Sequence, residues 1–281
     1  MKTYVQQIML GSVTSKEAEA RETLRRIKEA GYDGLELNSF MIHPTGLLVR
    51  MLTKAAGMPT GKGGKLDWNA LLRDTDLGVV SLHTDLGSLE RDAAAVAAEA
   101  KSFETDRVVI TGMYRFDYGD EKAVRELAQR LNRAGETLRA QGIELLYHNH
   151  NIELLPLGNG KRAYDLLIEE TDTNYVNFEF DSSWFTDGGA DAKDWMTKLG
   201  SRMMLWHVTD RGSRQKGAAM TPILKCDSME LGTGNIDLDG LLSLARENGV
   251  ENVILESHKN WTDKDPVKSL ETSALWLNAR K

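Results

Sequence analysis

The sequence has a single cysteine, Cys226, and lacks both a long apolar run and a basic tract; each absence excludes a class of protein. One cysteine cannot form an intramolecular disulfide or a thiolate metal cluster. No apolar stretch approaches the roughly 20 residues that a membrane helix needs. With a formal net charge of −7, the chain is a poor candidate for nucleic-acid binding, which depends on neutralising phosphates. Residues 1–7 lack the pattern of a signal peptide, so we expect a soluble cytoplasmic protein without nucleic-acid or membrane partners.

The composition is instead typical of a protein with a packed core. The chain has 281 residues, of which 41% are hydrophobic and 27% are charged, and this balance favours a globular fold over disorder. The length suffices for one large α/β domain or two small ones.

Short apolar segments alternate with amphipathic segments along the whole chain. The expected strands are 7–11, 34–38, 78–82, 107–111, 143–148, 175–180, 202–206 and 252–255. The expected helices are 17–30, 47–56, 67–77, 89–103, 121–141, 161–170, 192–199, 238–248 and 266–278. About eight strand-then-helix units predict a parallel sheet covered by helices. At this length they favour a closed (β/α)8 TIM barrel that forms one domain over residues 1–281.

The main alternative to a barrel is an open doubly wound sheet. That fold often carries a Gly-x-Gly-x-x-Gly motif after its first strand, and the motif is absent here. The glycine-rich loop 57–64 lacks the Gly-Lys-Ser/Thr ending of a phosphate-binding loop. The barrel therefore remains the better prediction.

Side chains that can bind metals or transfer protons stand at the ends of the expected strands. In chain order they are Glu36, His83, His148, His150, Asp181, His207 and Glu256. Each has a structural explanation by itself, since a histidine at a strand end often hydrogen-bonds to the core and Asp181 could simply cap a helix. However, the carboxyl ends of the strands carry the active site of a TIM barrel. Four of the six histidines gather there, which favours a functional site.

The segment Tyr-His-Asn-His at 147–150 ends the fifth expected strand. Side chains alternate between the faces of a strand, so His148 and His150 share one face and Asn149 points the other way. Imidazole and carboxylate ligands without thiolate suit Mn²⁺, Zn²⁺, Co²⁺, Fe²⁺ or Mg²⁺. A metal that holds a carbonyl and a neighbouring hydroxyl would favour an enediolate, while a nearby histidine or glutamate moved the proton.

Several segments occur in the order and spacing of one known superfamily. They are Ala30 to Leu37 (AGYDGLEL), Ser81 to His83, Tyr147 to His150 with Glu153, Phe180-Asp181, Leu205 to Asp210 (LWHVTD), Leu231 to Asp237 (LGTGNID) and Val253 to Glu256 (VILE). On these segments the chain resembles, nearly end to end, the sugar phosphate isomerase/epimerase superfamily with xylose isomerase-like TIM barrels. The resemblance implies a divalent metal held by His148, Asp181, His207 and Glu256.

Two positions depart from the pattern of that superfamily. Many members have Glu where this chain has His148, and members that epimerise use two metal-bound glutamates as bases. An imidazole removes that symmetry and lowers the negative charge of the site by one. Relatives with Tyr-His-Asn-His look more like lyases or hydratases that act on oxidised sugars. Thr209 stands where the family often has Lys, and Lys259 is the candidate to replace that lysine, although it also reads as a surface residue.

The resemblance also suggests roles for the remaining residues. Glu153 and Glu256 are the candidate bases and His150 the proton shuttle. Substrate contacts are expected from Glu36, His83, Trp184 and Lys259.

Three functions fit this set of residues. The first is a metal-dependent isomerase or epimerase of a ketose or polyol-derived sugar. The second is a lyase or dehydratase that acts on a keto-sugar or 3-keto-glycoside; because both reactions pass through an enolate, the metal site alone does not separate them. The third is a non-catalytic, metal-free barrel that binds a carbohydrate. An abasic-site endonuclease would need more metal ligands and a basic face. The connection 211–231 is expected to be a lid or a contact within a homo-oligomer.

Overall fold

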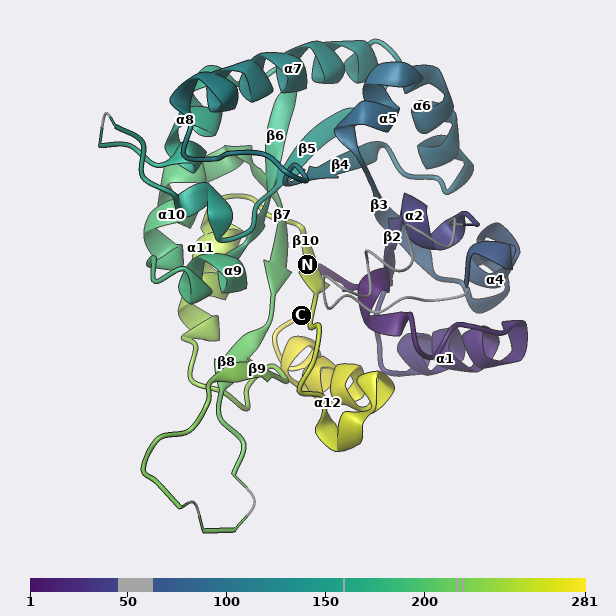
Figure 1. Ribbon diagram of the computed structural model, residues 1–281. Coiled ribbons are helices and arrows are strands. Elements are labelled where there is room, and N and C mark those ends of the chain that lie inside the picture. Colours follow the sequence, from purple (N-terminus) through teal and green to yellow (C-terminus); the bar gives the residue numbers. More distant parts are fainter. Residues whose placement is uncertain (45–62, 159, 216, 219) are drawn as a thin grey trace. The chain divides into compact units, whose positions relative to one another are not determined.

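The computed structural model describes residues 1–44, 63–158, 160–215, 217–218 and 220–281 (Figure 1). Eight parallel strands form a closed barrel in the order β1-β10-β7-β6-β5-β4-β3-β2, so the expected (β/α)8 fold is confirmed. The contacts divide the chain into two compact units. Unit 1 comprises Met1–Gly78, Val208–Leu242 and Val253–Lys281, and unit 2 comprises Val79–His207 and Ser243–Asn252. The expected helix 47–56 and most of the loop 57–64 lie outside the described residues.

Unit 1 contains the first two strands and the closing elements of the chain. Its elements are β1 (Lys2–Gln6), η1 (Gln7–Leu10), α1 (Glu17–Glu29), β2 (Gly34–Asn38), α2 (Ser39–Ile42), η2 (Gly63–Lys65), α4 (Trp68–Thr75), β8 (Asp210–Gly212), β9 (Asp227–Met229), β10 (Asn252–Leu255), η5 (Thr262–Lys264) and α12 (Pro266–Asn278). Helix α11 (Leu238–Glu247) begins in unit 1 and ends in unit 2.

The first strand lies earlier than the expected 7–11. Residues Gln7–Leu10 form a turn of 3-10 helix, because the Gln6 side chain accepts a hydrogen bond from the Ile8 backbone nitrogen at 2.8 Å and closes the turn. All four residues of this turn are buried. Their apolar character therefore reflects burial and not strand geometry.

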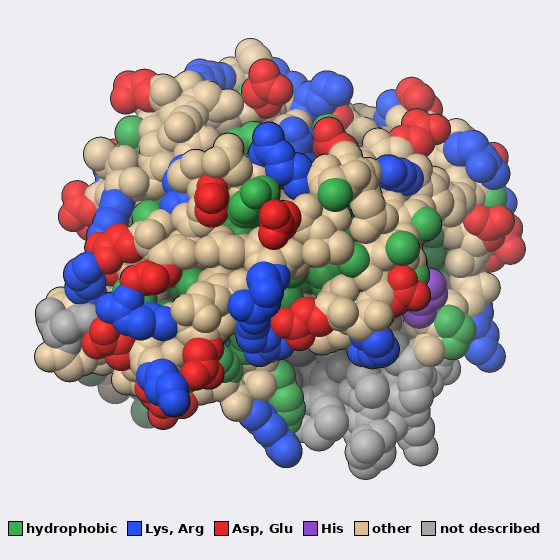
Figure 2. Space-filling model, turned by 90° about the horizontal axis from the view of Figure 1, so that it is seen from above, with side chains coloured by type: hydrophobic (Ala, Val, Ile, Leu, Met, Phe, Trp, Pro, Cys, Tyr) green, Lys and Arg blue, Asp and Glu red, His purple; other side chains and the backbone are tan. Residues whose placement is uncertain are grey.

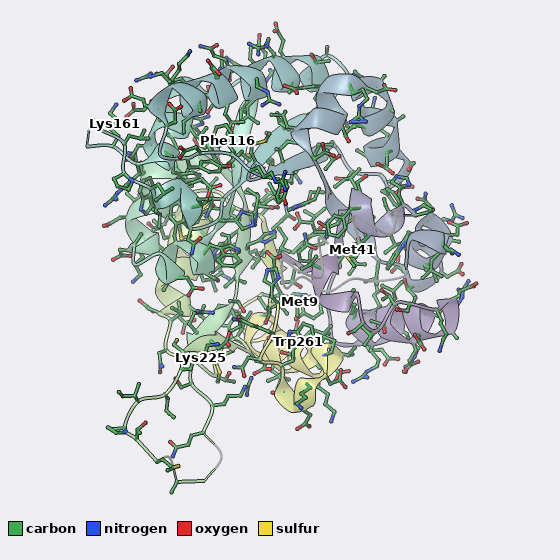
Figure 3. All side chains as sticks on the ribbon, viewed as in Figure 1. Met9, Met41, Phe116, Lys161, Lys225 and Trp261 are labelled. Carbon is green, nitrogen blue, oxygen red and sulfur yellow. The ribbon has the colours of Figure 1, made fainter. Side chains whose placement is uncertain are left out.

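The connection 211–231 contains a small antiparallel hairpin. Strands β8 and β9 pair Asp210 with Met229 and Gly212 with Asp227. The loop between the two strands extends away from the hairpin (Figure 1), and Lys225 lies near its base (Figure 3). The ammonium group of Lys225 is 4.0 Å from Asp227.

Unit 2 contains the middle strands of the barrel. Its elements are β3 (Gly78–Thr84), α5 (Leu86–Arg91), α6 (Ala93–Ser102), β4 (Arg107–Thr111), α7 (Glu121–Arg139), β5 (Glu144–His148), η3 (Ile152–Leu154), α8 (Ala163–Glu170), β6 (Val176–Asp181), α9 (Ser182–Asp187), α10 (Ala192–Leu199), η4 (Gly200–Arg202) and β7 (Met203–Val208). The expected helix 89–103 is two helices. The break falls at Asp92, whose carboxylate accepts a hydrogen bond from Ala95 and caps α6.

Strand β6 shows how the core positions polar side chains. Phe178 and Phe180 on one face are fully buried, and both pack against Tyr164 of α8, with ring centroids 5.5 and 6.5 Å apart. Burying a phenylalanine contributes about 2–3 kcal/mol, so these contacts fix the orientation of the strand. The alternate residues Glu179 and Asp181 must then point to the opposite face.

On the face drawn in Figure 2, Lys and Arg side chains are interspersed with Asp and Glu side chains. Among the residues described, no helix is both long and apolar enough to cross a membrane.

Candidate active site and metal centre

The strand register in unit 2 brings polar residues from neighbouring strands into line. His148 of β5 is the register partner of Glu179 on β6, and Asp181 of β6 is the partner of His207 on β7. All four side chains are buried. The carboxyl ends of these parallel strands therefore form a continuous polar layer.

Three of these residues form a group that can hold a metal. His148, Asp181 and His207 each offer a ligand atom, and these atoms lie within 4.8 Å of one another. Two imidazoles and one carboxylate, without a thiolate, fit the divalent cations expected from the sequence. The group includes His148 and not His150.

Asp181 has a structural role as well. Its Oδ1 atom accepts hydrogen bonds from the backbone nitrogens of Ser183 and Trp184, at 2.7 and 2.9 Å, and so caps α9. Its other oxygen, Oδ2, faces His207, with 4.0 Å between Oδ2 and the ring Nδ1. One carboxylate oxygen of Asp181 thus caps the helix, and the other is placed where it could bind a metal together with His207.

Asn149 fixes the end of β5 against β6. As expected, it points away from His148: its side-chain nitrogen donates to the Asp181 carbonyl, and its side-chain oxygen accepts from the Asp181 backbone nitrogen, both at 3.0 Å. This pair of bonds imitates a strand pairing just beyond the register of the two strands. It holds His148 and Asp181 in a fixed relation.

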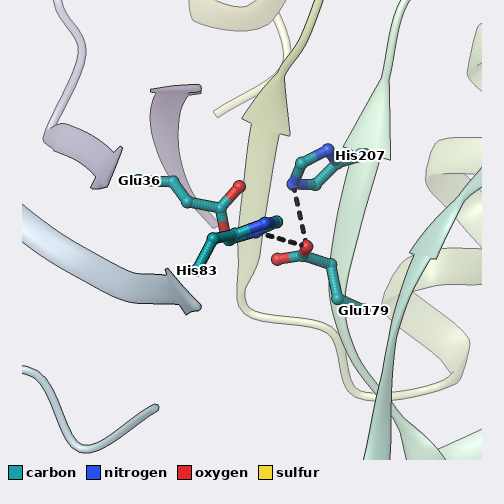
Figure 4. A group of neighbouring side chains, drawn as sticks. All are labelled: Glu36, His83, Glu179 and His207. Atoms are coloured by element: carbon teal, nitrogen blue, oxygen red, sulfur yellow. Dashed lines mark ion pairs between the residues drawn. The ribbon is translucent and has the colours of Figure 1, made fainter. Parts of the chain in front are cut away.

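Glu179 is a central residue that the sequence analysis did not single out. Its Oε2 atom lies 2.9 Å from His83 Nε2, 3.0 Å from His148 Nδ1 and 3.2 Å from His207 Nε2. Figure 4 shows His83 and His207 joined to this carboxylate. Burial opposes its ionisation, but electrostatic attraction by the neighbouring His207 and His83 and hydrogen bonds from His148 and His207 hold the pKa of Glu179 well below its usual range.

A sequence signal for Glu179 does exist. In Val-Asn-Phe-Glu-Phe-Asp, residues 176–181, polar residues alternate with apolar ones. This alternation places Glu179 on the same face as Asp181, one layer deeper in the barrel. His83 was expected to contact substrate, and the structure brings it to Glu179.

A second buried network surrounds Glu153. Tyr118 and Tyr147 share a hydrogen bond of 2.8 Å between their hydroxyls, and Tyr147 donates to Glu153 Oε1 at 2.7 Å. Glu153 Oε2 accepts from the His150 backbone nitrogen at 2.9 Å. Burial raises the pKa of the Glu153 carboxyl, against the hydrogen bond from Tyr147, which lowers it. Both oxygens of this predicted base are thus engaged in holding the loop that carries His150.

Two neighbours shape the surroundings of this network. Phe116, labelled in Figure 3, packs edge-on against Tyr118 with ring centroids 4.7 Å apart. A Cβ atom on Gly112 would lie 3.0 Å from Glu153 Oε1 and 3.3 Å from His150 Nδ1. Glycine at the end of β4 therefore gives the carboxylate and the imidazole the space they occupy.

His150 and Trp184 lie beside the metal-capable group. The His150 ring is 5.1 Å from the His148 ring and 5.5 Å from Trp184, measured between centroids. Both side chains are half-buried, so each keeps some exposure. The predicted proton shuttle and the predicted substrate contact at Trp184 therefore lie side by side.

The other predicted site residues belong to unit 1. Glu36 is buried at the end of β2 and accepts a hydrogen bond from Gln6 at 3.0 Å. Glu256 follows β10, with 3.2 Å between its carboxylate and His258 Nε2. The Lys259 side chain is 61% exposed and lies 3.4 Å from Asp227, which is the behaviour of a surface lysine. Trp261, labelled in Figure 3, donates from its indole nitrogen to the Ser257 carbonyl at 3.2 Å.

Comparisons with known proteins agree with this fold. The model of a family described as xylose isomerase-like TIM barrel matches residues 24–280. A sugar phosphate isomerase/epimerase from Parabacteroides distasonis superposes with a TM-score of 0.78 at 20% identity, covering 99% of this chain and 94% of that one. A xylose isomerase-like TIM barrel protein from Mycobacterium smegmatis, solved in complex with magnesium, superposes with a TM-score of 0.67 at 15% identity, covering 99% and 94% of the two chains.

The sequence relatives cover less of the chain. An inosose dehydratase from Clostridium perfringens is 26% identical over 143 residues, which are 48% of this chain and 47% of the relative. The match therefore spans about half the length of that curated relative.

Proposed function

Because the chain belongs to the xylose isomerase-like TIM barrel family, we propose that it is a divalent-metal-dependent dehydratase of a polyhydroxy ketone, such as an inosose or a keto-sugar. The observation that carries this proposal is the buried group of His148, Asp181 and His207 at the carboxyl ends of the strands. Glu256 stays in the proposed ligand set on sequence grounds, because it comes directly after β10, while Asp181 stands at the end of β6.

The proposed metal is Mn²⁺, Zn²⁺, Co²⁺, Fe²⁺ or Mg²⁺, and when bound it would supply Lewis-acid polarisation of a substrate carbonyl. The residues around it have separate tasks. Asn149 keeps His148 and Asp181 at a fixed separation through its two bonds to the Asp181 backbone. Trp184 offers an apolar face beside His150, against which a sugar ring can pack.

Dehydration needs a proton taken from the carbon next to the carbonyl and a proton given to the departing hydroxyl, so that water leaves and a carbon–carbon double bond forms. We assign this proton transfer to His150, which neighbours both His148 and Trp184. An imidazole can accept the first proton and return it to the leaving group, so one residue serves both steps.

Elimination is preferred to epimerisation because of Glu153. Two-base epimerisation needs a second carboxylate that is available for proton transfer, and both Glu153 oxygens already accept hydrogen bonds. His148 replaces the glutamate that many epimerases of this superfamily carry, and the curated relative in Clostridium perfringens is named an inosose dehydratase. An isomerase or epimerase, the leading prediction from the sequence, is the second candidate because it needs the same metal group.

The decisive experiment combines metal analysis with product analysis. The protein, stripped with a chelator and reloaded with each cation in turn, is incubated in D₂O with an inosose and with a panel of ketoses. Loss of one water and an olefinic proton signal in the NMR spectrum support the dehydratase. An epimer with one deuterium at the reacting carbon would replace that proposal with the second candidate. Absence of both turnover and stoichiometric metal would point to a non-catalytic sugar-binding barrel.

A further inference from the structure

The three histidines that meet Glu179 do so with different nitrogens. His83 and His207 use Nε2, whereas His148 uses Nδ1. Strands β5 and β7 flank β6 on opposite sides, so His148 and His207 approach the carboxylate from two directions. One oxygen atom, Oε2, is the common partner of all three rings.

A carboxylate is purely an acceptor of hydrogen bonds, so each nitrogen that bonds to it must carry a proton. A neutral imidazole has one N–H group and one lone pair, and a metal binds through the lone pair. The nitrogen that faces Glu179 is therefore unsuitable as a ligand. The other nitrogen of the same ring becomes the ligand atom.

We propose that Glu179 is a positioning residue that fixes the tautomers of these rings, so that His148 presents Nε2 and His207 presents Nδ1 to the metal. The direction of His207 agrees with this assignment, since its Nδ1 atom faces Asp181 Oδ2 at 4.0 Å. The metal-binding part of this inference rests on the proposed function, whereas the tautomers themselves do not.

Long-range ¹H–¹⁵N correlation spectra of the metal-stripped, ¹⁵N-histidine-labelled full chain test the tautomers directly. At neutral pH we expect the Nδ1–H form for His148 and the Nε2–H form for His207. Single histidine substitutions assign the signals. Finding His148 as the Nε2–H form, or rapid exchange between tautomers in both His148 and His207, would overturn the proposal without any metal or substrate being added.

Glu179→Gln tests the link between the tautomers and the metal. A carboxamide is uncharged and is a weaker acceptor than a carboxylate, so it holds the N–H groups of His148 and His207 less firmly. We expect mixed tautomers and a 10- to 100-fold weaker Kd for Zn²⁺ or Mn²⁺, the range typical of lost outer-shell partners. Glu144→Gln is the matched control, because Glu144 lies at the opposite end of β5 and accepts instead from Asn177 at 3.1 Å.

The possible results separate the two proposals. If the wild-type chain shows the expected tautomers but binds no metal, the positioning role of Glu179 stands and the metal-dependent function fails. If Glu179→Gln keeps the wild-type tautomers and the wild-type Kd for the metal, the positioning role of Glu179 fails even though metal binds. Should Glu179→Gln not fold, the wild-type spectra alone still decide the tautomer assignment.

Discussion

Asp181 and His207 are register partners across β6 and β7, with 4.0 Å between Asp181 Oδ2 and His207 Nδ1. This separation is too long for a hydrogen bond. Zinc bonds to nitrogen and to carboxylate oxygen are each about 2.0–2.2 Å, so two ligands of one ion can lie up to about 4 Å apart. The pair therefore suits a shared cation better than a direct contact.

Asp181→Asn is expected to abolish metal binding while leaving the fold intact. The asparagine side chain keeps an oxygen that can accept from Ser183 and Trp184, so the cap of α9 survives. The lost negative charge should weaken metal affinity at least about 100-fold and reduce turnover in proportion. Metal content by elemental analysis and the melting temperature check both parts, and Glu256→Gln should behave alike.

Asp191→Asn is the matched control for this substitution. Asp191 caps α10 through a bond from Lys193 at 2.9 Å and is not among the metal-capable residues. It should match wild type in metal content. A fully active, metal-loaded Asp181→Asn protein would remove Asp181 from the proposed site.

The two possible roles of Glu153 predict different kinetics. If Glu153 is a base, Glu153→Gln should lower kcat by several orders of magnitude. If Glu153 instead anchors the loop that carries His150, the protein should tolerate this substitution. Its two hydrogen bonds favour the second role, so we expect Glu153→Gln to keep kcat within about tenfold of wild type. Steady-state kinetics with the inosose or ketose that the protein turns over provide the measurement.

Tyr147→Phe extends this test to the rest of the network. Removing the hydroxyl deprives Glu153 and Tyr118 of a buried partner, which should lower the free energy of unfolding by about 1–3 kcal/mol. An effect confined to kcat, without any change in urea unfolding, would argue that the tyrosine takes part in proton transfer.

The sequence was sufficient to predict the barrel fold, because the strand-then-helix pattern is repeated along the chain. Strands such as Arg107–Thr111 and Asn252–Leu255, and helices such as Ala192–Leu199, begin and end where their apolar patterns predict. The misplaced first strand has a physical cause, since a buried 3-10 turn and a buried strand are both short apolar runs. One hydrogen bond from Ile8 to Gln6 separates them, and an apolar pattern does not encode it.

The sequence predicts the candidate site residues that stand at strand ends. It does not predict the one that lies deeper in the barrel, inside a strand. His148, Asp181 and His207 follow apolar strands, so their places on the rim could be inferred. Glu179 stands inside a strand, and its importance comes from histidines 31 and 28 positions before and after it. Such convergence depends on the strand register, which one sequence does not reveal.

Gly234→Ala is expected to destabilise the chain, because the Gly234 backbone packs closely against the Asp210 carboxylate. Asp210 Oδ2 accepts hydrogen bonds from the backbone nitrogens of Gly232 and Gly234, at 3.0 and 2.8 Å. A Cβ atom on Gly234 would lie 2.4 Å from Asp210 Oδ1 and 2.5 Å from the Arg211 carbonyl, so the loop would have to move. We expect a loss of about 2 kcal/mol or more in the free energy of unfolding.

Gly158→Ala is a suitable control, because a Cβ atom there would meet nothing within 4 Å. Urea unfolding should show the two variants well apart. If Gly234→Ala were as stable as Gly158→Ala, the tight wrapping of this loop around Asp210 would be incorrect.

The last prediction concerns acid stability and Glu230. Burial by itself would raise the pKa of this carboxyl, but hydrogen bonds from Ser269 and Arg214 and from the Thr262 backbone outweigh it and lower the pKa to about 2. A carboxyl whose pKa is lower in the folded chain stabilises the fold above its unfolded pKa of 4.5. That stabilisation is lost as the pH falls from 4.5 towards 2.

Glu230→Gln isolates this contribution, which the shift puts at about 3 kcal/mol. Urea unfolding at pH 7 should show the variant less stable than wild type by roughly that amount. Near pH 2 the difference should shrink, because the wild-type carboxyl is then protonated as well. Asp239→Asn, which breaks a solvent-exposed pair with Arg280, should show a much smaller pH-dependent difference, because solvent screens that pair. A constant gap between wild type and Glu230→Gln at every pH would mean that the variant loses packing and not charge, and the lowered pKa would then not be the source of the stability.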